Sequence, residues 1–217
     1  MKTKSMIALM ATLLMAEMGL AQTTGTVALT GTNPAAVSIT NTSDATLSTT
    51  VALGTLTPAT GGSLTSGTFQ VRMRSSKAYV LSAQTTALSF TGLGDTDGGN
   101  TISATDIGFG ITALANTGAN VANSGSRTDT IVAKFSYTGG YPAVTNGLTP
   151  FVAGTNGTLN DISSNTQILS GTRISTKGNI STNNNFILAT LGIATLPQYF
   201  TPNTDFSATI TLTVTAP

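Results

Sequence analysis

Residues 206–215 read FSATITLTVT, and this stretch decides the fold class. Its apolar residues Phe206, Ala208, Ile210, Leu212 and Val214 alternate with serine and threonine. A period of two places one set of side chains in a core and the other in water, which is typical of a half-buried β-strand. Threonine suits the wet face, because its branched Cβ favours an extended backbone while its hydroxyl stays solvated.

Shorter versions of this alternation recur along the chain, separated by turns such as Thr138-Gly139-Gly140-Tyr141. They lie at residues 26–30, 36–40, 46–53, 69–74, 78–83, 87–91, 107–112, 130–137, 168–176 and 186–191. The pattern predicts an all-β fold, an antiparallel β-sandwich of about 8–11 strands that is immunoglobulin-like or jelly-roll-like. The polar stretches 113–128 and 146–167 are expected to be long loops.

The N-terminus predicts export. Lys2 and Lys4 precede an apolar run at residues 6–16, and Gly19 and Ala21 are small residues suited to a cleavage site after Ala21. The run is too short to span a bilayer comfortably, so residues 1–21 are interpreted as a signal peptide and no membrane insertion is expected after cleavage. We expect a secreted or cell-surface protein, with periplasmic transit in a Gram-negative cell. Residues 22–34 would then form an N-terminal strand and residues 35–217 a single sandwich domain.

Charge and cysteine usage narrow the class of partners. Without residues 1–21, seven basic residues balance seven acidic ones. Neither nucleic acid nor an anionic membrane surface is therefore an expected partner, because both attract excess positive charge. Cysteine is absent, so the fold depends on burial and hydrogen bonding alone.

The residue types that are absent favour a protein that is not an enzyme. Residues 22–217 contain no His, Cys, Glu or Trp, which removes the commonest general base, the thiol nucleophile and the usual zinc ligands. A mechanism with two carboxylates would need two of the seven aspartates to meet in one cleft.

One stretch resembles a calcium-binding loop in its spacing. Asp95, Asp97 and Asp106 would take positions 1, 3 and 12 of a twelve-residue loop. Gly99 offers no side-chain oxygen at position 5, and Asn100 stands where glycine is preferred. A plain turn before the strand at Ile107 is therefore the preferred interpretation, with calcium as the alternative and no other cofactor expected.

Arg72, Arg74 and Lys77 form a basic cluster, and alternation places Arg72 and Arg74 on the same strand face. A solvated outer face, or an edge guarded by charge against unwanted pairing, is the preferred interpretation. A ligand-binding role is the alternative.

The two ends of the chain carry a family resemblance. Residues 22–32 read QTTGTVALTGT, residues 53–58 read LGTLTP, and the C-terminal strand alternates as described. Together they resemble secreted bacterial fimbrial or spore-coat-U-like subunits. The resemblance implies an immunoglobulin-like sandwich that lacks a strand, which the N-terminal strand of a neighbouring copy completes to form a non-covalent fibre. This chain departs from the family in having no disulfide and in ending Thr215-Ala216-Pro217 without an aromatic strand.

By position, the resemblance implies that Val27 and Leu29 are the inserted side chains, and that Phe206, Ile210, Leu212 and Val214 line the groove. The expected function is a structural subunit of a fimbria or biofilm matrix, assembling as a homo-oligomer or fibre through its terminal strands. Adhesion through the two long polar loops is a further expectation. The alternative is a self-contained surface binding or adhesion module, with or without calcium.

Overall fold

The structure is a computed structural model. It describes residues 28–31, 35–59, 62–92, 102–117, 128–145, 150–174, 186–198 and 204–217. The chain divides into two units, Met1–Pro34 and Ala35–Pro217. In the first unit, the described residues 28–31 form no strand. The described sheets and the core belong to the second unit.

The described part of the second unit consists of ten strands and two short 3₁₀ helices. The strands are β1 (Val37–Thr40), β2 (Thr65–Ser75), β3 (Tyr79–Thr85), β4 (Ser89–Gly92), β5 (Ile107–Thr117), β6 (Asp129–Ile131), β7 (Thr166–Gly171), β8 (Phe186–Thr195), β9 (Thr204–Ser207) and β10 (Ile210–Thr215). The 3₁₀ helices are η2 (Ala133–Phe135) and η3 (Asn160–Ile162). The predicted all-β class is confirmed.

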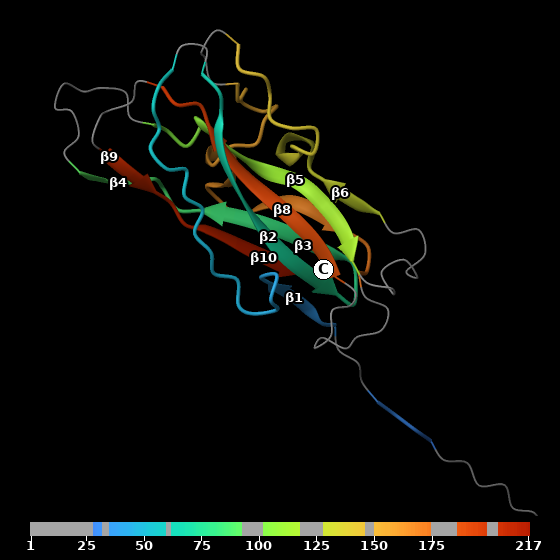
Figure 1. The fold of residues 1–217 in the computed structure, drawn as a ribbon. Coiled ribbons are helices and arrows are strands. Elements are labelled where there is room, and N and C mark those ends of the chain that lie inside the picture. The colour runs from blue at the N-terminus through green and yellow to red at the C-terminus, as the bar shows by residue number, and fades with distance from the viewer. Residues whose placement is uncertain are drawn as a thin grey trace, which may run out of the picture. The chain divides into compact units, whose positions relative to one another are not determined.

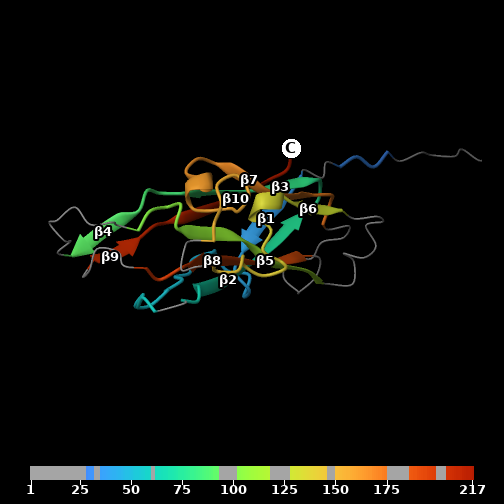
Figure 2. The same ribbon diagram turned by 90° about the horizontal axis from the view of Figure 1, so that it is seen from above.

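Two four-stranded sheets form the sandwich (Figures 1 and 2). Sheet A has the order β1-β2-β8-β5, and sheet B has the order β10-β3-β7-β6. The seven ladders between the described strands are all antiparallel. Strands β4 and β9 form a separate two-stranded ribbon, which lies at one end of the sandwich in both views.

The core lies between sheets A and B. Fully buried side chains come from sheet A, as with Val71, Met73 and Phe109, and from sheet B, as with Leu81 and Leu169. Along β2 and β3 these residues recur at every second position, as the alternation in the sequence predicted. The antiparallel sandwich is therefore a direct consequence of the period-two pattern.

Several predicted segments differ from the structure, among them residues 28–30 of the strand expected at 26–30, which form no strand. Residues 46–53 form no strand, although the Val51 side chain lies where a Cβ on Gly67 of β2 would be. The chain leaves β1 through a turn closed by the Asn41 N–H, which donates to Ala45 O at 3.0 Å, and the residues that follow make no ladder with β2. Residues 113–117, expected in a loop, continue β5. Of residues 130–137, only the first two belong to a strand, and η2 follows.

Aromatic rings cover one part of the outer face of sheet A. The rings of Tyr137, Tyr141 and Phe151 contact one another, with centroids 4.7–6.4 Å apart. A Cβ on Gly192 would overlap the Tyr141 hydroxyl, so the ring sits directly on the backbone of β8. Burial raises the pKa of Tyr141 to about 12, because the anion would lose its hydration there.

Candidate strand-addition site

Strand β10 is an edge strand of sheet B and pairs with β3 in register, from Ile210 opposite Thr85 to Thr215 opposite Val80. The Thr86 N–H donates to Thr209 O at 3.0 Å, which makes these two residues a hydrogen-bonded pair. Hydrogen-bonded and non-hydrogen-bonded pairs alternate in an antiparallel ladder. The N–H and C=O groups of Ile210, Leu212 and Val214 therefore point away from β3, toward the edge of sheet B that none of the described strands occupies.

The same three residues carry the apolar side chains of β10. Ile210, Leu212 and Val214 are only half-buried and pack against the core, while Thr211, Thr213 and Thr215 are exposed. Strand β1 of sheet A lies close to β10 but forms no ladder with it. One edge thus combines outward-pointing backbone groups with inward-facing apolar side chains that are incompletely covered, which are the two requirements for an added strand.

The edge of sheet A at β5 is covered over its first half. The Phe109 N–H donates to Gly157 O, the Leu159 N–H donates to Ile107 O, and the Tyr137 N–H donates to Ile111 O, each at 2.9 Å. These bonds occupy one outward-pointing backbone group on each of Ile107, Phe109 and Ile111. Strand β6 at the other edge of sheet B is only three residues long, which also limits pairing.

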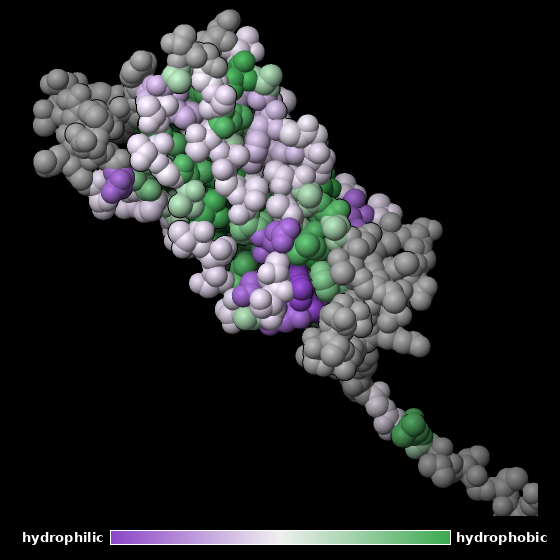
Figure 3. Space-filling view, viewed as in Figure 1, coloured by the Kyte–Doolittle hydropathy of each residue, from purple (hydrophilic) through white to green (hydrophobic). Residues whose placement is uncertain are grey.

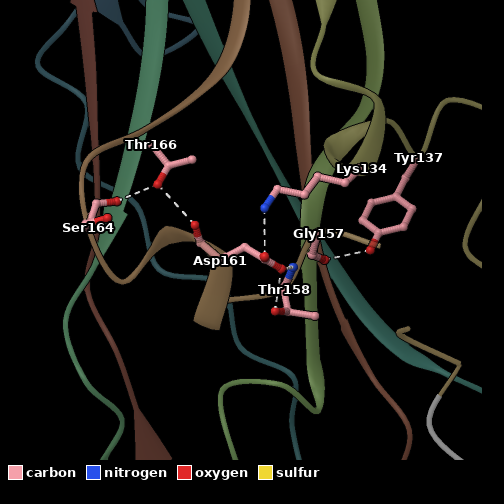
Figure 4. Close-up of polar contacts among 7 residues, drawn as sticks. All are labelled: Lys134, Tyr137, Gly157, Thr158, Asp161, Ser164 and Thr166. Atoms are coloured by element: carbon pink, nitrogen blue, oxygen red, sulfur yellow. Dashed lines mark hydrogen bonds and ion pairs between the residues drawn. The ribbon is translucent and has the colours of Figure 1, made fainter. Parts of the chain in front are cut away.

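A polar network joins the two segments that cover this edge, residues 134–137 and 157–161 (Figure 4). The Lys134 ammonium lies 2.8 Å from Asp161 Oδ1, and the Thr158 N–H and hydroxyl donate to Asp161 Oδ2 at 2.9 and 2.8 Å. Partial burial acts to raise the pKa of Asp161, but Lys134 and Thr158 outweigh it and hold that pKa below 3.8. The Tyr137 hydroxyl donates to Gly157 O at 2.6 Å on the same side.

Phe206 is not part of the β10 edge, which corrects the prediction of one continuous strand. It lies in β9, opposite Phe90 of β4. Ser207 pairs with Ser89 and Ile210 with Thr85, so Ala208 faces both Ala87 and Leu88 across the ladder. Two residues against one is the geometry of a β-bulge, and it separates the ribbon from sheet B. The Phe206 side chain still packs against the core cluster.

The two predicted donor residues lie in the first unit. Val27 is outside the described residues, and Leu29 is 97% exposed. No strand includes residues 28–31.

Of the three aspartates considered for calcium, the structure describes one. Asp95 and Asp97 lie outside the described residues. Asp106 Oδ2 accepts hydrogen bonds from the Ser103 N–H at 2.8 Å and the Ser103 hydroxyl at 2.7 Å. Its carboxylate therefore closes the turn that precedes β5. Within the described ranges, no three His, Cys, Asp or Glu side chains come together.

The basic cluster differs from its prediction. Arg72 and Arg74 do point away from the core, but neither is fully solvated: Arg74 is buried at 7% exposed, and the Arg72 side chain is 21% exposed. The Asp44 carboxylate binds both guanidinium groups, and the Phe186 ring lies beneath them. Sequence reasoning missed Asp44, although its Asn-Thr-Ser-Asp turn directly after the β1 strand was a usable signal.

Comparison with known proteins assigns the chain to no family. No protein-family model and no curated protein matches the chain. The part of the chain that the structure describes contains no helix long and apolar enough to cross a membrane.

Proposed function

We propose that this protein is an exported, non-catalytic structural subunit that assembles with copies of itself by strand addition at β10. The observation that carries the proposal is the coincidence, on Ile210, Leu212 and Val214, of outward-pointing backbone groups and only half-buried apolar side chains. A strand added there would gain ladder hydrogen bonds, and its alternate side chains would cover the open side of the core.

The proposed donor is the segment around Val27 and Leu29 of a neighbouring copy. Its apolar residues are two positions apart, the spacing needed for neighbouring side chains on one face of a strand. Leu29 is almost fully exposed, so it offers apolar surface for burial on assembly. The balanced charge of residues 22–217 also favours close packing of copies, because little net repulsion holds them apart.

A proline at the centre of the edge tests the acceptor. Leu212→Pro removes an N–H that points outward, so the fold should survive while the added strand loses a hydrogen bond and a compatible backbone. Leu212→Ala is the matched control, because it loses the same side chain and keeps the N–H. We expect sedimentation of the exported chain to show polymers for the wild type and Leu212→Ala, and monomers for Leu212→Pro.

The donor is tested in the same assay. Leu29→Asp places a charge in the proposed groove and should abolish polymers, whereas Ala28→Asp places it on the opposite strand face and should leave them. The proposal fails if the wild-type protein stays monomeric across the accessible concentrations, with or without residues 22–32.

A further inference from the structure

Sheet A carries a positive site on its outer face, at the end where β2 leads into β3. Arg72 and Arg74 lie there, two positions apart on β2. Met73 between them and Val71 before them face the core. Their guanidinium carbons lie 4.5 and 5.4 Å from the centroid of the Phe186 ring on β8. Figure 3 shows hydrophilic side chains gathered on this end of the face, over β1 and the end of β2.

The two arginines share one carboxylate. Asp44 Oδ2 lies 3.0 Å from Arg72 Nη1, and Asp44 Oδ1 lies 2.8 Å from Arg74 Nη2. Asp44 is held by a turn in which Asn41 Oδ1 accepts hydrogen bonds from the Ser43 and Ala45 N–H groups, at 2.8 and 3.0 Å. The cluster therefore has two positive charges and one negative charge.

The positive charge is not fully compensated. The Nε atoms of both arginines are buried and have no hydrogen-bond partner, and the Arg74 side chain is only 9% exposed. A guanidinium group removed from water normally has its N–H groups paired, because leaving them unpaired is costly. Stacking on Phe186 offsets part of this cost but supplies no negative charge.

Further basic residues lie at the same end of the molecule. Lys77 follows β2 directly and is exposed, and Arg173 is exposed next to Ile174, whose N–H donates to Ser75 O at 3.0 Å. Four of the five basic residues that the structure describes are thus in this region, against the acidic residues Asp44 and Asp129. An anion approaching from solvent would meet Arg72 first, because its side chain is 21% exposed.

We propose that the Arg72–Arg74 pair binds an oxyanion, such as a sulfate, phosphate or carboxylate group, that shares the two guanidinium groups with Asp44. Planar guanidinium forks suit the paired oxygens of such groups. The anion could be free in solution or carried by an acidic polymer, and both sources present the same chemistry to the site.

Titration calorimetry of the full chain with sodium sulfate, at constant ionic strength set by chloride, tests the proposal. We expect saturable binding that Arg72→Gln weakens about tenfold or more, since a charge-assisted hydrogen bond is lost. Arg72→Lys keeps the positive charge but lacks the fork, so it should also bind more weakly while the fold remains intact.

Asp44→Asn is the decisive variant. Asparagine tolerates the positive φ of 62° at this position, so the turn should be retained while the competing carboxylate is lost. Sulfate should then bind more tightly than to the wild type and restore the thermal stability that the substitution removes. Binding by Asp44→Asn alone would overturn the proposal, because Asp44 would then be the complete counter-ion. Absence of binding in both proteins would also overturn it.

Dextran sulfate identifies the source of the anion. Binding that is tighter per sulfate group than for inorganic sulfate, and lost in Arg72→Gln, assigns the site to a polymer. Equal affinity per sulfate group, again lost in Arg72→Gln, assigns it to a free anion.

Discussion

Gly110 of β5 lies directly beneath residues 135–137, which cover the β5 edge of sheet A. A single methyl group added at Gly110 should therefore destabilise the fold strongly. A Cβ at Gly110 would overlap the Phe135 carbonyl oxygen, and would lie 2.7 Å from Tyr137 Cδ2. The Phe135 backbone cannot simply move away. The Tyr137 N–H bonds to Ile111 O at 2.9 Å on one side, and Lys134 O accepts the Gly157 N–H at 2.6 Å on the other.

We therefore expect Gly110→Ala to lose about 3 kcal/mol of the free energy of unfolding, the upper part of the usual cost of overpacking. For a domain of this size that is a fall of about 6–12 °C in the midpoint of thermal unfolding. Gly139→Ala is the control, because a Cβ there meets nothing within 4 Å. It should be neutral or slightly stabilising through the lower entropy of the unfolded chain. Equal midpoints by circular dichroism for the two variants would refute the reasoning.

Substitutions at Asp161, Tyr141 and Asn41 should each have a measurable effect. The lowered pKa of Asp161 should contribute stability above pH 3.8 that is lost as the pH falls through the folded-state value, and Asp161→Asn should flatten that dependence in urea titrations at different pH. The raised pKa of Tyr141 should contribute stability below pH 10 that is lost as the pH rises through about 12, and Tyr141→Phe should remove one late step from the ultraviolet absorbance titration. Asn41→Ala should lose about 1 kcal/mol with the two hydrogen bonds of its turn, measured by thermal unfolding.

The alternation in the sequence identified most strands because it records which residues face a core. Ile210, Leu212 and Val214 face inward as predicted. The same pattern failed at residues 46–53, where half-buried and exposed residues also alternate around Val51 and Leu53. A strand needs a partner beside it as well as a core beneath it, and the turn at Asn41–Ala45 leaves these residues without a ladder.

Contacts between distant residues explain the other differences. The sequence around Arg74 does not predict that Asp44 and Phe186 cover it, because Asp44 is 30 residues away in the sequence and Phe186 is 112 residues away. The alternation from Phe206 to Val214 also continues unbroken through the bulge, because the extra residue is in the opposite strand, at Ala87 and Leu88. The position of Phe206 outside sheet B therefore has no signal in its own segment.

Period-two alternation also does not predict whether a strand lies at the centre or at the edge of its sheet. That position decides whether β10 can accept another strand. The register with β3 supplies the distinction, because it turns the N–H of Leu212 outward and that of Thr213 toward Ser82. Proline at 212 should therefore leave a folded protein, whereas proline at 213 should break a ladder bond and unfold it. If both substitutions unfolded the chain to the same degree, β10 would be bonded on both sides, and strand addition would have to occur elsewhere.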